Sequence, residues 1–169
     1  MSVLIRSRVD ADIPALADVL VRVHAQDGYP VEGVADPEAW LRSDRMLGAW
    51  VAEVASEIVG HVMVAEPGEG DEAAKLLAHR DGLLMEEIAV LGRLFVDPAA
   101  RGQHLADHLM ASGVAAAHEA GRRAALDVMQ KDQAAIATYQ RLGWVSLGRF
   151  EHVIPGGSEP ALAFHLPVC

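Results

Sequence analysis

Residues 93–106 read RLFVDPAARGQHLA, and this stretch decides the fold expected for the chain. Its first half is a β-prone run that Pro98 ends, and its second half predicts a helix beginning at Arg101-Gly102. A helix start leaves backbone N–H groups without intrahelical partners, and the helix dipole adds positive potential there. Such a turn can bind a phosphate, with charge supplied by Arg101 and close approach allowed by Gly102. Many helices begin this way, so the pattern alone is a weak signal.

A second informative stretch lies further along the chain. Leu126-Asp127-Val128 predicts a strand, and residues 132–144 read DQAAIATYQRLGW. Asp132 can cap a helix there, and Gly143 stops it. Asp127 could face a cleft or satisfy local backbone donors. Together with the first stretch, this pattern predicts a β-α-β unit in the second half of the chain.

The rest of the sequence predicts further strands and helices, without an internal repeat or linker. The expected strands are Val3–Arg8, Ala49–Val54, Ile58–Val64, Glu86–Val96, Ala124–Met129, Trp144–Ile154 and Ala161–Leu166. The other expected helices run from Asp10 or Asp12 to about His24 and from Asp36, with a helical turn at Ala73–His79. Gly92 is the expected place of a bulge. This order gives an α/β fold with early antiparallel strands, and the length fits a single domain spanning residues 1–169.

The first stretch resembles the acetyl-CoA signature of the GNAT family of N-acetyltransferases. Leu94, Val96 and Pro98 match the family's strand of the type Leu-x-Val-x-Pro. Arg101 and Ala106 match the ends of the following Arg/Gln-x-x-Gly-x-Gly/Ala, whose middle glycine is replaced here by His104.

The second stretch is similar to the family's Asn-x-x-Ala-Ile-x-x-Tyr-x-x-x-Gly-Phe. Asp132 stands where asparagine is usual, and Trp144 stands where phenylalanine is usual. An aspartate caps a helix as well as an asparagine, but its ionised side chain cannot donate a hydrogen bond to CoA.

The resemblance implies the GNAT acyl-CoA N-acyltransferase fold: an α/β, mostly antiparallel mixed sheet that is splayed between its fourth and fifth strands and flanked by helices. It also implies acetyl-CoA as cosubstrate, with the pantetheine arm in the gap. The residues that it assigns to the cofactor are Leu94, Phe95, Val96, Arg101, Gly102, Gln103, His104, Leu105, Ala106, Asp132 and Tyr139. Only the backbone N–H of His104 is expected to take part, and a glycine there is expected to cost up to about 1 kcal/mol of stability.

Acyl transfer from a thioester to an amine needs a neutral amine and a proton for the departing thiolate. An alkyl amine has a pKa of about 10, so a base or a desolvating site must help. Family members commonly protonate the CoA sulfur with a tyrosine at the place of Tyr139; a ring packed on the core is the alternative. Glu86 and Glu87 are the candidate bases, directly or through a water, although adjacent strand residues face opposite sides. Solvated carboxylates are the alternative for both.

The acceptor pocket has several candidate residues. Trp40, Trp50, Tyr29 and the loop Asp27–Glu32 are implied by the family, in which the first two helices and their connection usually line that pocket. Ordinary core packing is the alternative for the two tryptophans.

Two histidines, His104 and His108, lie four residues apart on one predicted helix. The glutamate of a zinc-protease motif is missing between them, so a solvated helix face is favoured and no metal is expected.

The composition argues against several classes of function. A net charge of −10 argues against nucleic-acid binding. No apolar run of about 18 residues predicts a membrane span, and the N-terminal residues do not resemble a signal peptide. The one cysteine, Cys169, allows no intramolecular disulfide, which is compatible with a reducing cytoplasm.

These observations predict a cytoplasmic enzyme in which a primary amine of a small molecule attacks acetyl-CoA directly, without an enzyme nucleophile. A protein lysine or N-terminal acetyltransferase and a non-catalytic acyl-CoA sensor are the alternatives, and the presence of Tyr139 favours an enzyme. A metal-dependent hydrolase has little support. A homodimer formed through the last strands is a further expectation.

Overall fold

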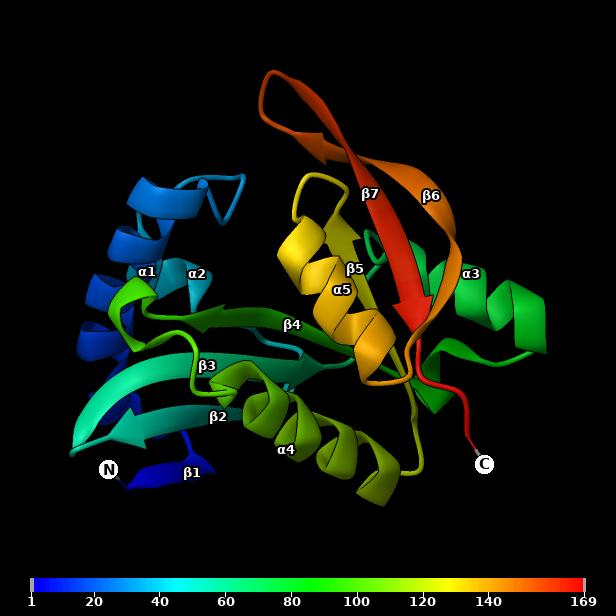
Figure 1. Cartoon of the computed structure of the whole chain (residues 1–169). Coiled ribbons are helices and arrows are strands. Elements are labelled where there is room, and N and C mark those ends of the chain that lie inside the picture. The colour runs from blue at the N-terminus through cyan, green and yellow to red at the C-terminus, as the bar shows by residue number, and fades with distance from the viewer. Residues whose placement is uncertain (1, 169) are drawn as a thin grey trace.

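The sheet has the strand order β1-β2-β3-β4-β5-β7-β6 in the computed structural model, which describes residues 2–168 (Figure 1). The strands are β1 (Val3–Ser7), β2 (Met46–Val54), β3 (Glu57–Ala65), β4 (Ile88–Val96), β5 (Arg123–Met129), β6 (Val145–Ile154) and β7 (Gly157–His165). The helices are α1 (Ile13–Asp27), α2 (Pro37–Trp40), α3 (Glu72–Asp81), α4 (Leu105–Glu119) and α5 (Gln133–Arg141). Neighbouring strands are antiparallel except β4 and β5, which confirms the predicted mixed α/β sheet.

Three boundaries differ from the predicted ones. Helix α4 begins at Leu105 rather than at Arg101, because Gly102 and His104 have φ values of +87° and +57°, which a right-handed helix cannot contain. The predicted helical turn at Ala73–His79 is the longer helix α3. Asp132 occupies the position before α5, but its side chain makes no capping hydrogen bond.

Helices cover both faces of the sheet. Helices α4 and α5 pack on the face that includes Leu126 and Val128 of β5, whereas α3 packs on the opposite face against Ala125. Helix α1 forms a separate core cluster with Val51 and Phe95. Because side chains alternate along a strand, Asp127 shares the face of Ala125. Within residues 2–168, no helix combines the length and the apolarity that crossing a membrane requires.

Helix α4 lies close to the sheet because its inner face carries a glycine. A Cβ atom added at Gly113 would lie 3.0 Å from Leu91 and 3.3 Å from Val64, so a larger residue would push the helix away. This packing fixes the start of α4, and therefore the turn that precedes it.

A bulge in β4 opens the sheet. His61 of β3 pairs with Phe95 and Met63 pairs with Gly92, so one residue of β3 lies opposite two residues of β4, Arg93 and Leu94. Arg93 has a φ of +50°, one position after the predicted bulge residue Gly92. Strands β4 and β5 pair only between 88–90 and 123–125, and they diverge beyond that point (Figure 1).

A buried histidine holds this bulge. The His61 ring is fully buried, and its Nδ1 lies 2.8 Å from the carbonyl oxygen of Arg93 while its Nε2 lies 3.0 Å from Nη1 of Arg8. A guanidinium only donates, so Nε2 accepts and Nδ1–H donates to the bulge carbonyl. The ring also stacks on Phe95, with centroids 5.3 Å apart. Burial, chiefly, lowers the pKa of His61 to about 3, so the ring is neutral at physiological pH.

We expect His61 to make the fold sensitive to acid. An unfolded histidine has a pKa of about 6.5, so between that value and the folded pKa of about 3 the unfolded chain binds the extra proton. The contribution of the neutral His61 ring to the free energy of unfolding is fully present above pH 6.5. As the pH falls it is lost, by at most about 1.4 kcal/mol per pH unit. Urea unfolding between pH 7.5 and 5 should therefore show a steeper loss in the wild type than in His61→Gln.

The exposed His118 provides the control, because His118→Gln should keep the wild-type slope. An NMR titration of the wild-type imidazoles tests the same point without a variant. Equal slopes for all three proteins, or a His61 ring that protonates near pH 6, would contradict this account.

Candidate active site

A cavity of about 1280 Å³ lies where β4 and β5 diverge. Its walls are the end of α1 and the α1–α2 loop, the second half of β4, the turn before α4, the end of β5 and helix α5. We call this space the central cavity. It connects the α4–α5 face of the sheet with the face that carries α1, α2 and α3.

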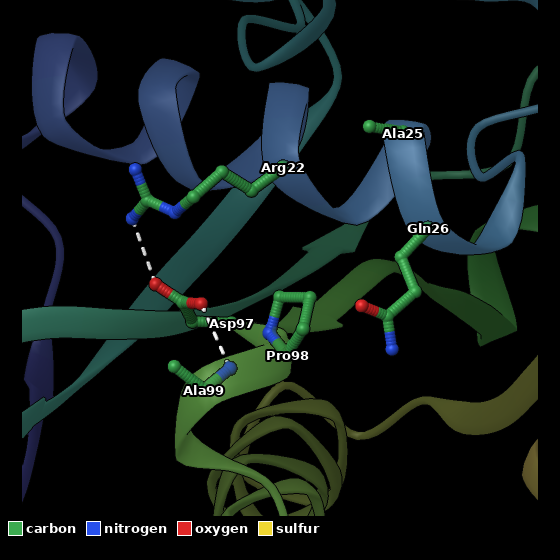
Figure 2. Close-up of a pocket in the computed structure, with 6 residues that line it drawn as sticks. All are labelled: Arg22, Ala25, Gln26, Asp97, Pro98 and Ala99. Carbon is green, nitrogen blue, oxygen red and sulfur yellow. Dashed lines mark hydrogen bonds and ion pairs between the residues drawn. The ribbon is translucent and has the colours of Figure 1, made fainter.

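One ion pair fixes the turn that follows β4. An oxygen of Asp97 lies 2.7 Å from a guanidinium nitrogen of Arg22 on α1, and the other accepts a hydrogen bond of 3.1 Å from the backbone N–H of Ala99 (Figure 2). Burial alone would raise the pKa of Asp97, but these two partners outweigh it and lower that pKa. The turn is thereby tied to α1 on one side of the central cavity.

The start of α4 presents free backbone donors to the central cavity. The first helical hydrogen bond runs from the N–H of His108 to the carbonyl of His104, so the N–H groups of Leu105, Ala106 and Asp107 have no acceptor within the helix. These residues border the central cavity. The arrangement suits an anion, as the sequence predicted.

The side chains of this turn point in different directions. The His104 side chain is 77% exposed and lies 3.8 Å from the Asp107 carboxylate, and the residue borders the cavity. The Gln103 amide donates to the carbonyl of Ala100, 3.3 Å away, and does not border the cavity.

The Arg101 guanidinium lies at the end of α1. It is 2.6 Å from the Asp27 carboxylate and also donates to the carbonyl of Val96, at 3.2 and 3.3 Å. An incoming phosphate would have to compete with Asp27 for this charge.

Helix α5 brings Tyr139 to the opposite wall. The Tyr139 ring packs on Trp144 and Phe164, each with a centroid separation of 6.4 Å, and the residue also borders the central cavity. Burial raises its pKa well above the ordinary value, with further contributions from Asp127 and Asp132. Tyr139 therefore packs its ring in the core and also borders the cavity, so both predicted placements of this residue hold.

The sequence model of the acetyltransferase (GNAT) family matches residues 15–144. The chain belongs to this family of acetyltransferases. No curated protein matches the sequence.

Solved structures share the fold of this GNAT acetyltransferase along nearly its whole length. Ribosomal-protein-alanine N-acetyltransferase from Brucella melitensis has a TM-score of 0.74 at 21% identity, with 98% of this chain and 99% of that chain covered. Ribosomal-protein-S18-alanine N-acetyltransferase from Escherichia coli has a TM-score of 0.72 at 20% identity, covering 99% and 94%. The protein yncA from Salmonella typhimurium, solved with its cofactor acetyl-CoA, has a TM-score of 0.73 at 15% identity, covering 100% and 95%.

The two glutamates considered as bases do not reach the central cavity of this GNAT acetyltransferase. Glu86 and Glu87 belong to a 3-10 turn that precedes β4, where both are exposed, and neither borders the cavity. The Glu87 carboxylate instead accepts a hydrogen bond of 2.7 Å from the backbone N–H of Leu84. The β-rich run was expected to begin at Glu86, but pairing with β5 begins only at Ile88.

Other ionisable groups do border the cavity. Asp127 faces it, and burial raises the pKa of its carboxyl group while the nearby His152 lowers it. Tyr29 is half-buried beside it, and desolvation, followed by the neighbouring Tyr139 and Asp127, raises the Tyr29 pKa well above its ordinary value. His152 of β6 contacts Glu32 of the α1–α2 loop at 2.8 Å. Sequence patterns could not find this pair, because the two residues lie 120 positions apart.

Of the two tryptophans considered for the acceptor pocket, only one borders the central cavity. Trp40 borders the cavity and makes an edge-to-face contact with Tyr29, with centroids 5.8 Å apart. Trp50 does not border it, because its ring lies over Gly48 and packs against the core beneath α4. Among residues 2–168, no group of three or more histidine, cysteine, aspartate or glutamate side chains is placed to hold a metal ion.

We expect His104→Gly to preserve CoA binding and to stabilise the fold. The positive φ of His104 costs a residue with a Cβ roughly 1 kcal/mol or more, whereas glycine adopts it freely. The greater freedom of glycine in the unfolded chain offsets about 0.4–1 kcal/mol of this gain, so the net change should lie between zero and about 1 kcal/mol. This reverses the loss expected from the sequence.

Chemical unfolding and a CoA titration measure both effects. Ala111→Gly, at an exposed right-handed position in α4, is the matched control and should lose about 1 kcal/mol. A folded His104→Gly variant that no longer binds CoA would show that the imidazole itself takes part.

Proposed function

We propose that this chain transfers the acetyl group of acetyl-CoA to a primary amine of a small molecule, by direct attack of the amine on the thioester. The observation that carries the proposal is the position of Tyr139 and Asp127 at one cavity, reached from opposite faces of the sheet. Tyr139 belongs to the α4–α5 face, where the free N–H groups can hold a pyrophosphate. Asp127 belongs to the other face, where an amine can enter.

The cofactor side fits an extended thioester arm. From Leu91 onward, β4 has no strand partner on its β5 side, so the backbone near Leu94, Phe95 and Val96 can pair with the amides of pantetheine. The free N–H groups of residues 105–107 lie at the far end of this path for the pyrophosphate. The Arg101 guanidinium can add positive charge beside the pyrophosphate once its ion pair with Asp27 breaks.

The acceptor side fits a cationic amine. Four carboxylates border the cavity there: Glu32, Glu66, Asp71 and Asp127. The two arginines of the same wall are engaged by backbone carbonyls, Arg45 by Pro67 at 3.1 Å and Arg93 by Trp40 at 2.7 Å. An ammonium ion would therefore meet carboxylates whose charge the arginines do not directly pair.

The contact between His152 and Glu32 favours a small molecule over a protein acceptor. It joins the β6–β7 hairpin to the α1–α2 loop beside the cavity, so an extended polypeptide would have to displace it.

We further propose that residues 1–169 act as one cytoplasmic domain that binds neither nucleic acid nor membranes. The net charge of −10 supports this. The edge position of β6 supports a homodimer formed through the last strands, since one side of its backbone pairs with no other strand of the chain within residues 2–168.

An amine panel with acetyl-CoA tests the function. CoA release should occur with at least one of 1,4-diaminobutane, spermidine, phenethylamine and L-lysine, above the rate without amine. Activity confined to a peptide with an N-terminal alanine or an internal lysine would indicate a protein acetyltransferase instead. Binding of acetyl-CoA without release in any reaction would indicate a sensor.

We expect Tyr139→Phe to lower kcat by about 10²- to 10⁴-fold, the usual effect of removing a positioned proton donor. This corresponds to about 3–5 kcal/mol in the activation barrier. The CoA affinity should hold, because the ring that packs on Trp144 and Phe164 remains. Steady-state kinetics and a separate CoA titration measure the two effects.

The control is His118→Gln, which changes an exposed side chain outside the central cavity and should leave kcat within about threefold. A Tyr139→Phe variant with nearly wild-type kcat would limit Tyr139 to its packing role.

A further inference from the structure

The acceptor amine needs a base, and the proposed acid Tyr139 cannot serve as one while it holds its proton. An alkyl amine reaches the cavity mostly as an ammonium ion, because its pKa is about 10. The two glutamates considered from the sequence lie outside the cavity. The inference below rests on the proposed function and concerns the group that removes this proton.

Most charged groups on the acceptor side already have other partners. Asp71 accepts a hydrogen bond from the backbone N–H of Gly68, and Asp27, on the cofactor side, pairs with Arg101. Arg45 and Arg93 donate to backbone carbonyls, as described above. Glu66 is exposed.

His152 and Glu32 form a pair with the geometry of an oriented base. Nε2 of His152 lies 2.8 Å from a carboxylate oxygen of Glu32, and the side chains are 26% and 41% exposed. An ionised carboxylate only accepts, so Nε2 carries the hydrogen and donates it. In the neutral ring, Nδ1 then has a free lone pair, and His152 borders the central cavity.

Carboxylates from several elements lie near His152. Glu32 comes from the α1–α2 loop, and Asp127 of β5 is close enough for His152 to lower its pKa. Glu159 is the cross-strand partner of His152 on β7, and Glu151 is its neighbour on β6. Glu32, Asp127 and Glu159 are carboxylates that can attract a cationic amine, whereas the Glu151 side chain points to the other side of β6.

We propose that His152, oriented by Glu32, is the general base for the acceptor amine, and that Asp127 holds the ammonium ion beside it. The ammonium gives one proton to Nδ1 of His152, directly or through one water, and His152 passes it to solvent. The neutral nitrogen then forms a bond to the thioester carbon. As the C–S bond breaks, the sulfur takes the Tyr139 proton, and the new amide nitrogen loses its extra proton, which restores the phenol. One proton is released for each acetyl group transferred.

A histidine suits this step better than the carboxylate of Asp127. An unperturbed imidazole is a stronger base than an unperturbed carboxylate, and burial narrows this difference by raising the pKa of Asp127. Asp127 can nevertheless pair with the cation and place it.

The test compares two nucleophiles in the wild type and in His152→Gln. One is the alkyl amine of the panel that reacts fastest, and the other is hydroxylamine, which is already mostly neutral at pH 7. Glutamine keeps an N–H donor for Glu32, so the contact between the hairpin and the loop can persist. His118→Gln is the control for replacing an exposed histidine far from the cavity.

We expect His152→Gln to lower kcat/KM for the alkyl amine by about 10²-fold or more. Hydroxylamine should react within about threefold of the wild-type rate, because it has no ammonium proton to lose, and CoA affinity should hold. Glu32→Gln should also lower kcat/KM for the alkyl amine, since the imidazole loses the partner that orients it.

Three results would overturn the assignment. An unchanged kcat/KM for the alkyl amine in His152→Gln would exclude His152 as the base while leaving the proposed function intact. An equal loss of kcat/KM for the alkyl amine and for hydroxylamine would show that His152 has a structural role only. Failure of the wild type to acetylate any alkyl amine, despite binding acetyl-CoA, would reject the proposed function and the base with it.

Discussion

The short pairing between β4 and β5 is the constraint on which the rest of the structure depends. Two parallel strands would ordinarily continue side by side, but the bulge at Arg93 and Leu94 turns β4 away after Val90. The cost is an unusual backbone conformation at Arg93 and a row of peptide groups without strand partners. His61 stabilises the unusual conformation at Arg93 by binding its carbonyl oxygen. The unpaired peptide groups of β4 are available to a ligand. The interruption of the strand pairing therefore produces a binding site.

The gap also separates two chemical environments. On one face, free N–H groups at the start of α4 favour an anion, and on the other, carboxylates around Asp127 favour a cation. Two histidines show how surroundings set their roles. His61 is buried between a carbonyl and a guanidinium, so it stays neutral and structural. His152 contacts a carboxylate at the edge of the central cavity, where a substrate can reach it.

The sequence predicted the parts of this site that are local in the chain. The strand, turn and helix of residues 93–106 and the helix bearing Tyr139 have short-range signals: a proline, glycines and hydrophobic spacing. The α/β class followed from the order of the predicted elements, and the splayed sheet followed from the family resemblance. The start of α4 was placed too early, because the positive φ of His104 cannot be seen in a residue that usually avoids it.

Contacts between distant segments had no such signal. The contact of His61 with the Arg93 carbonyl depends on the register of β3 and β4, and that of His152 with Glu32 depends on how the hairpin packs against the α1–α2 loop. Glu86 and Glu87 were expected in a strand, but a 3-10 turn holds them outside the cavity.

A crystal structure of the complex with CoA tests the central claim most directly. The account predicts pantetheine between β4 and β5, its amides bonded to the backbone of residues 94–96 and its sulfur beside the Tyr139 hydroxyl. CoA bound elsewhere, or β4 and β5 paired along their full length, would contradict it.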